Sequence, residues 1–131
     1  LFEQMNEAHK KKLIDVLDNK FLSYGTVYRR MRKGKSTAEY RTDGIAGCLR
    51  TPKGGSSKQI LIQAGYGGWK VRLLTPREYA RLQGVRDDFI LPNNTNKGLF
   101  AMGDAVCVPV INFLSVNILS PVYEHWRAIP K

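Results

Sequence analysis

The sequence predicts an α+β fold in which a small, irregular β-sheet is followed by helices. Three observations support this class. Short β-prone runs at residues 46–49, 59–63 and 70–74 are separated by glycines, as is typical of strands joined by tight turns. A strong helix-start signal follows at Thr75. A long apolar stretch, residues 108–126, then predicts a final helix.

The N-terminal elements are predicted from spacing. Apolar side chains recur near the helical period over residues 2–17, and Asn19 with Lys20 can close that helix. A second short element is expected over residues 22–31. Residues 34–42 begin with a glycine and are mostly polar, so we expect a loop there.

The helix start at Thr75 is the best-defined local signal in the chain. Thr75 occupies the N-cap position, Pro76 the first helical position, and Glu78 lies three residues after the cap. Threonine and glutamate in this spacing form a capping box, in which each side chain bonds the other residue's backbone N–H. Leu74 and Tyr79 have the spacing of a hydrophobic staple across the cap. We therefore expect a helix over residues 76–83.

The C-terminal part is predicted to be a turn region and one helix. Residues 86–97 are rich in Asp, Pro and Asn, which favour turns. In the final helix Pro109 is acceptable in the first turn, whereas Pro121 is expected to kink or end it. No segment reaches the roughly 18 uninterrupted apolar residues of a membrane span, so no membrane association is expected.

The charge is concentrated in one window of the sequence. The chain carries a formal net charge of +10, and residues 29–81 hold thirteen of its 21 Lys and Arg but only three of its 11 Asp and Glu. This window therefore accounts for the whole excess, as expected of a face that binds a polyanion. The alternative is a solvated basic surface or arm around Arg29–Lys35.

Cysteines and histidines give little sign of a site. Cys48 and Cys107 are far apart and predict two free, buried thiols, because their context suggests neither export nor a metal cluster. His9 and His125 have no partner at ligand spacing. We expect no metal site.

One loop has the chemistry of a phosphate- and base-binding element. Residues 50–59 combine three cations, three hydroxyls and two glycines. Glycine lets a backbone approach closely, while cations, amides and hydroxyls donate to oxygens. The spacing of a Walker A loop is missing, so nucleoside triphosphate binding is not expected. The alternative is a simple hairpin turn between two strands.

Two motifs carry a resemblance to a known family. Residues 72–84, RLLTPREYARLQG, resemble the ninth signature block of DNA cytosine-5 methyltransferases. Residues 103–110, GDAVCVPV, resemble the tenth block, whose commoner form begins Gly-Asn where this chain has Asp104. Upstream, residues 25–30 and 43–52 look like the target-recognition region of a bacterial branch of these enzymes.

The resemblance implies a division of the chain. It covers about residues 24–121 and suggests the C-terminal portion of a larger α/β methyltransferase. Residues 1–23 would be an N-terminal helix and linker, residues 24–74 the target-recognition region, and residues 75–131 a helical segment with blocks nine and ten. From residues alone, the Gly103 motif reads as a tight turn into a buried helix.

The resemblance also implies which residues act. The positions that match contacts to the cofactor S-adenosylmethionine are Asp104, Ala105 and Val106. Since a carboxylate cannot donate as an Asn amide does, backbone groups would make the contact at the first of these. The expected contacts to duplex DNA are Arg50, Thr51, Lys53, Ser56, Ser57 and Lys58, with Arg29, Arg30 and Arg41 as phosphate partners. The residues expected to organise the region are Thr75, Arg77, Glu78, Arg81, Gln83 and Gly103.

The bond-forming parts of the family have no counterpart in this chain. The Pro-Cys nucleophile, the Glu-Asn-Val block, the arginine-rich eighth block and the glycine-rich cofactor strand are missing, and Cys48 and Cys107 do not follow a proline. The full-length protein is expected to methylate cytosine C5 at a specific duplex site, in a restriction-modification system of the bacterial cytoplasm. The chain alone is expected to be inactive.

Three alternatives follow. The first is a piece of a methyltransferase, favoured by the absence of an initiator Met; its partners would be duplex DNA and the rest of the catalytic domain. The second is a natural non-catalytic DNA-binding subunit of a split methyltransferase, and the third is an unrelated basic nucleic-acid-binding domain. In the first case the final helix would expose apolar surface, so the chain alone is expected to self-associate.

Overall fold

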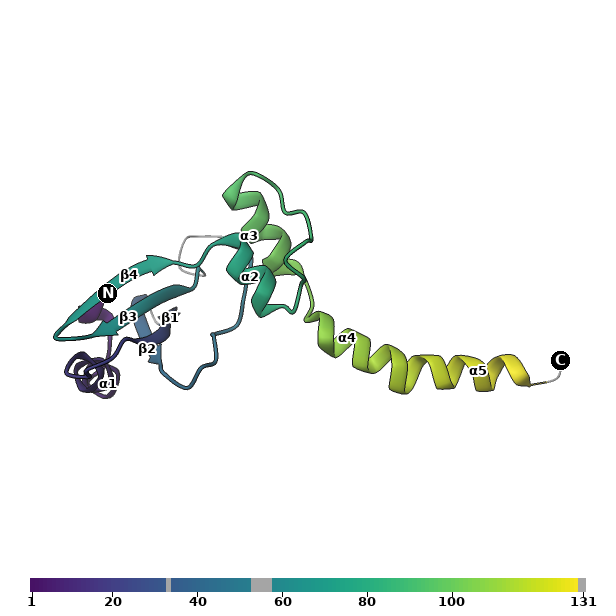
Figure 1. Cartoon of the computed structure of the whole chain (residues 1–131), viewed down its shortest axis with the longest axis horizontal. Helices are drawn as coiled ribbons and strands as arrows, with labels where there is room; N and C mark the ends of the chain where they lie inside the picture. Colours follow the sequence, from purple (N-terminus) through teal and green to yellow (C-terminus); the bar gives the residue numbers. More distant parts are fainter. Residues whose placement is uncertain (33, 53–57, 130–131) are drawn as a thin grey trace.

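The protein contains one four-stranded antiparallel sheet. The computed structural model describes residues 1–32, 34–52 and 58–129. The strand order is β2-β1-β3-β4, and all neighbours pair antiparallel (Figure 1). The strands are β1 (Ser23–Arg32), β2 (Lys35–Arg41), β3 (Ile60–Gly65) and β4 (Gly68–Leu73). The predicted α+β class, with a small sheet followed by helices, is confirmed.

Two predictions about the strands are wrong. The expected loop at residues 34–42 forms β2, which pairs with β1 from Thr26↔Arg41 to Arg32↔Lys35. Its buried side chains, Ala38 and Tyr40, alternate with more exposed neighbours, which is the period of a strand with one covered face. Conversely, residues 46–49 form no strand, although their composition favours one.

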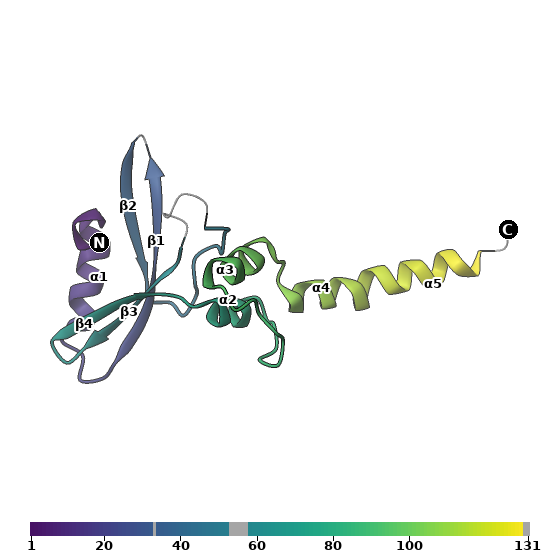
Figure 2. The same cartoon turned by 90° about the horizontal axis from the view of Figure 1, so that it is seen from above.

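The first hydrophobic core lies between the sheet and α1 (Glu7–Leu17), which covers one face of the sheet (Figure 2). Leu13 of the helix packs with Val27, Tyr40 and Ile62 of the strands. The predicted helix over residues 2–17 is interrupted: a 3-10 turn, η1 (Phe2–Gln4), precedes α1. The Asn6 side chain accepts a hydrogen bond from the His9 N–H, and this N-cap sets the start of α1.

The second core is formed by α2 (Pro76–Leu82) and α3 (Thr95–Asp104). Its buried side chains are Leu74, Tyr79, Ala80, Leu99 and Met102. Leu74 and Tyr79 belong to the same core, as the predicted staple requires. The turn region predicted over residues 86–97 ends earlier, because the Asn94 side chain accepts the Lys97 N–H and caps α3.

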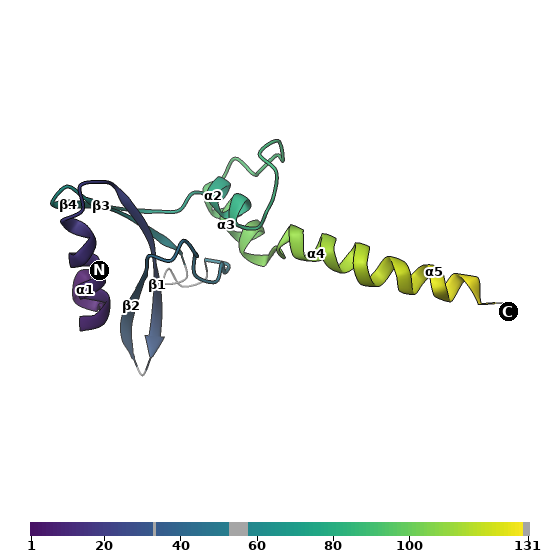
Figure 3. The same cartoon turned by 60° about the horizontal axis from the view of Figure 1, so that its bottom comes forward.

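The chain ends in a helix that extends away from both cores (Figures 1 and 3). It comprises α4 (Val108–Leu114), a π-helical segment η2 (Ser115–Leu119) and α5 (Ser120–Ala128), and none of its residues is buried. The prediction of a buried helix after Gly103 is therefore wrong. Pro121 does not end the helix either. It is the second residue of α5, two residues after the end of η2, and a π-helical turn accommodates a nearby residue that cannot donate the usual backbone bond.

By length and composition, the helical stretch Thr95–Ala128 is apolar enough to cross a membrane. The sequence prediction missed this because it required an uninterrupted apolar run, whereas an averaged hydropathy tolerates isolated Asn and Ser residues. The first part of the stretch, α3, packs on α2 through Leu99 and Met102. The exposed apolar side chains of the stretch Thr95–Ala128 are therefore concentrated after Cys107.

Candidate nucleic-acid interface

The start of α2 is fixed by a charged network. The capping box is present: Thr75 Oγ1 accepts the Glu78 N–H at 3.3 Å, and Glu78 Oε2 accepts the Thr75 N–H at 2.8 Å. The Arg72 guanidinium donates to both oxygens of the same carboxylate, at 2.6 and 2.8 Å. These bonds, first that from Arg72 and then those from Thr75, lower the pKa of Glu78 to about 2.

This network predicts an acid-dependent stability. The folded-state pKa of Glu78 lies below its ordinary value of 4.5, so its contribution is complete above about pH 4.5 and is lost as the pH falls toward about 2. The variant Glu78→Gln should be less stable at neutral pH and should show a flatter pH dependence across this window. Thermal unfolding followed by circular dichroism measures both effects.

Arg72→Gln removes the guanidinium and, like Glu78→Gln, should make the stability less dependent on pH in this window. An unchanged pH dependence of thermal unfolding in both variants would show that the Arg72–Glu78 pair does not control the loss of stability at low pH.

Two further arginines of block nine hold the segment that connects α2 to α3. Arg77 donates to the backbone carbonyls of Arg86 and Phe89, at 3.2 and 2.7 Å. Arg81 forms a bidentate ion pair with Asp87, at 2.8 and 3.2 Å. Both guanidinium groups therefore bond to the segment that follows α2.

Gln83 clamps the turn of block ten. Its Nε2 donates to the carbonyls of Met102 and Ala105, at 3.2 and 3.1 Å, and its own carbonyl accepts the Val108 N–H at 2.8 Å. The next residue, Gly84, has φ +73° and lies against the Pro109 ring, where a Cβ would clash. Only glycine suits this position on both counts.

The positions predicted to contact the cofactor lie at this clamped turn. Asp104 is the last residue of α3, and Asp104 and Val106 are exposed while Ala105 is partly buried. The turn therefore presents a carboxylate and two small apolar side chains beside one another. Its backbone is held from the α2 side by Gln83.

The C-terminal end of the predicted recognition loop, residues 50–59, is hydrogen-bonded to α2 and α3. Gln59, which is fully buried, donates its N–H to the Tyr79 hydroxyl at 2.9 Å and its Nε2 to the Cys48 carbonyl at 3.1 Å. Lys58 Nζ donates to Asn96 Oδ1 at 3.2 Å, at the start of α3. The predicted contacts Lys53, Ser56 and Ser57 lie outside the described residues.

The structure brings two of the predicted cationic contacts together. The guanidinium groups of Arg30 and Arg50 lie 5.2 and 5.8 Å from the ring centroid of Tyr28, within cation–π range. These groups come from β1 and from the 43–52 segment. Sequence reasoning missed Tyr28 and Gln59, although an aromatic residue between basic ones is a signal for the first of them.

The other predicted contacts lie elsewhere. Arg29 follows Tyr28 in β1, so by strand alternation it points to the face that α1 covers. Arg41 forms a bidentate pair with Asp43, at 2.6 and 3.1 Å. Thr51 is partly buried. Among the described residues, therefore, only Arg30 and Arg50 of the predicted cationic contacts gather at the Tyr28 ring.

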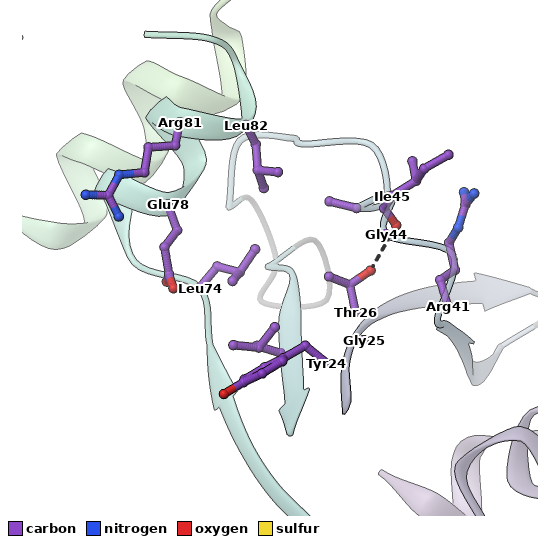
Figure 4. Close-up of a pocket in the computed structure, with 12 residues that line it drawn as sticks. Tyr24, Gly25, Thr26, Arg41, Gly44, Ile45, Leu74, Glu78, Arg81 and Leu82 are labelled. Atoms are coloured by element: carbon purple, nitrogen blue, oxygen red, sulfur yellow. Dashed lines mark hydrogen bonds between the residues drawn. The ribbon is translucent and has the colours of Figure 1, made fainter. Parts of the chain in front are cut away.

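Two neighbouring hollows lie between α2 and the 43–52 segment, and the first of them also reaches the sheet. The first has a volume of about 310 Å³, and Figure 4 shows Leu74 and Leu82 of the α2 side facing Thr26 of β1 across it. The Thr26 hydroxyl donates to the Ile45 carbonyl at 3.3 Å. The second, of about 480 Å³, runs along residues 44–49 to the clamped turn at Ala105. The 43–52 segment therefore forms a wall of both hollows.

The two cysteines are free, but the prediction that both are buried is wrong. Cys48 is exposed and Cys107 is partly exposed. Cys48 lies in the irregular 43–52 segment and Cys107 caps α4, positions that neither core covers.

Comparison with known proteins identifies the family. A family model of the C-5 cytosine-specific DNA methylases matches residues 2–120. The chain is 31% identical over 116 residues to the type II methyltransferase M.SsoII of Shigella sonnei, a match that covers 88% of this chain and 27% of that protein. It is 52% identical over 40 residues to M.BanI of Aneurinibacillus aneurinilyticus, covering 30% of this chain and 9% of that protein. No solved structure gives a significant match.

The chain therefore belongs to the C-5 cytosine-specific DNA methylase family. This membership excludes the alternative of an unrelated basic nucleic-acid-binding domain. The chain spans only 27% of the length of M.SsoII, so it corresponds to a limited part of such an enzyme.

Proposed function

We propose that this chain is the DNA-recognition part of a DNA cytosine-5 methyltransferase. Residues 24–74 would read the duplex, and residues 75–131 would connect that region to the catalytic part, with residues 1–23 covering the sheet. The complete enzyme would transfer a methyl group from S-adenosylmethionine to cytosine C5 in a specific sequence, within a bacterial restriction-modification system in the cytoplasm. The bond-forming groups would lie in the remainder of the enzyme.

One observation carries the proposal: Arg30 and Arg50 gather at Tyr28 on the face of β1 opposite α1. Cations of this kind donate to phosphate oxygens and base edges, and the positive excess of the chain lies in the same part of the sequence. Arg50 begins the 50–59 loop, and Lys58 and Gln59 at its other end are bonded to α3 and α2, so we include the described ends of this loop in the candidate surface.

The clamped turn fits a contribution to the cofactor site. Backbone groups at Asp104 would contact S-adenosylmethionine, and Ala105 and Val106 would offer small apolar contacts. When bound, the cofactor supplies the methyl group. The role of this chain there is to hold the turn in place through Gln83.

The DNA-binding prediction is tested by removing the two gathered cations. The double variant Arg30→Ala/Arg50→Ala should bind duplex DNA more weakly than the wild-type chain. Its slope of log K against log salt should fall by about two, because each lost phosphate contact releases about one counterion fewer. Fluorescence anisotropy at several salt concentrations measures both quantities, and a tritiated methyl assay on the same chain should show no transfer.

A matched control removes equal charge from another face. Lys11 and Lys12 are exposed on α1, across the sheet from Tyr28. Lys11→Ala/Lys12→Ala should change the slope less than the arginine variant does. Equal effects of the two double variants would mean that binding follows net charge alone, and methyl transfer by the wild-type chain would refute the assignment of catalysis to another part.

A further inference from the structure

Gly103 lies directly against the backbone of the 43–52 segment. A Cβ at this position would be 2.5 Å from both Arg50 C and Thr51 N, and 2.6 Å from the Arg50 carbonyl O. Side-chain carbons do not approach backbone atoms so closely, and a peptide group cannot rotate aside as a flexible side chain can. Any larger residue at 103 must therefore change the position of the Arg50–Thr51 peptide relative to α3.

The contact joins two functional regions. On one side, Gly103 is followed at once by the clamped turn that we assign to the cofactor site, and Gln83 bonds the carbonyls of Met102 and Ala105 on either side of it. On the other side, Arg50 carries a guanidinium that lies at Tyr28. Thus Gly103 sets the distance between the clamped turn and Arg50, at the N-terminal end of the 50–59 loop.

We propose that Gly103 is a positioning residue for sequence discrimination, a role that rests on the proposed DNA-recognition function. Hydrogen bonds to base edges require accurate placement of the donor, whereas contacts to the phosphate backbone depend mainly on charge. Displacing the Arg50–Thr51 peptide therefore impairs the reading of bases more than it impairs general attraction to DNA. Through Gly103, the position of the reading loop is tied to the cofactor-side turn.

The test compares two glycines of α3. Gly103→Ala adds a methyl group against the Arg50–Thr51 peptide, whereas Gly98→Ala adds it against the side chain of Pro76, 2.8 Å from its Cβ. Both substitutions replace glycine by a better helix former, and neither changes the charge. The full chain is used at low concentration, with a duplex that the wild-type chain selects from a randomised library and with the unselected library as the second probe.

The expected result separates discrimination from general binding. Gly103→Ala should lower the ratio of affinities for the selected and unselected duplexes by about tenfold, the scale of one lost base contact. Its affinity for the unselected library and its salt slope should match those of the wild-type chain, and Gly98→Ala should keep the wild-type ratio. A merely structural role would lower both affinities together.

Failure of the inference is distinct from failure of the proposed function. If the wild-type chain binds no duplex or selects no sequence, the proposed function falls and this inference falls with it. If the wild-type chain selects a duplex and Gly103→Ala keeps its ratio, or Gly98→Ala loses as much, only the inference is overturned.

A second variant covers the case in which Gly103→Ala does not fold. Gln83→Met keeps the side-chain length but removes the donor that bonds the carbonyls of Met102 and Ala105. It should also lower the ratio of affinities for the selected and unselected duplexes, by a smaller factor than Gly103→Ala does. In that case, a wild-type ratio in Gln83→Met overturns the inference.

Discussion

The chain on its own is expected to self-associate through its C-terminal helix, residues 108–128. None of these residues is buried, and apolar side chains face solvent all around the helix; Phe113 and Val122, for example, are 61% and 63% exposed. Contiguous apolar surface of this extent is rare in soluble monomers and usually marks an interaction site. In the complete enzyme we expect the remaining catalytic domain to cover this helix.

Sedimentation velocity over a range of concentrations measures the effect. The wild-type chain should form dimers or larger species, and Phe113→Glu/Val122→Glu should shift it to monomer, because an unpaired charge is costly to bury in an apolar contact. Ile14→Glu is the control, since it places a single glutamate at an exposed apolar position on α1. It should leave the association unchanged.

Two outcomes would contradict this prediction. One is a wild-type chain that stays monomeric at high concentration. The other is flotation of the chain with lipid vesicles in preference to self-association, which would assign the stretch Thr95–Ala128 to a membrane.

Replacing Tyr79 should destabilise the chain more than any other single change described above. Its ring is buried in the second core and its hydroxyl accepts the Gln59 N–H at 2.9 Å. Tyr79→Ala removes a buried aromatic ring, a change that typically costs about 3–5 kcal/mol. It also leaves the buried Gln59 N–H without this acceptor, so the variant should be largely unfolded or close to it.

Tyr79→Phe separates the two contributions. It keeps the ring and removes only the acceptor, which should cost about 1–3 kcal/mol. Tyr123→Ala, at an exposed position of α5, is the matched control and should change stability little. Urea unfolding followed by circular dichroism measures all three, and a Tyr79→Ala variant as stable as Tyr123→Ala would show that the second core does not depend on this ring.

Local chemistry made the start of α2 predictable from the sequence. The capping box needs only Thr75 and Glu78 at the correct spacing, and both hydrogen bonds are present. The sheet was predictable as a class because its glycines and β-prone runs are local features. The helix after Cys107 was predictable for the same reason. The local motif at Gly103 suggested a buried helix, whereas the resemblance implied the exposed apolar surface that is found, because burial depends on what packs against the helix.

Other features depend on contacts between distant residues. Lys35–Arg41 has no strong strand pattern of its own and becomes β2 because β1 pairs with it and α1 covers Ala38 and Tyr40. Arg29 and Arg30 are neighbours in sequence but point to opposite faces of a strand. The contact of Gly103 with the Arg50–Thr51 peptide joins residues too far apart for any local pattern to reveal.

The anchoring of residues 50 and 58–59 has a consequence for how such a protein diversifies. The Gly103 contact holds Arg50 and Thr51 at one end of the intervening stretch, and the bonds of Lys58 and Gln59 hold the other end. Natural variation can therefore exchange those intervening residues while both anchors stay intact. A new target preference would then arise without the cost of evolving a new scaffold.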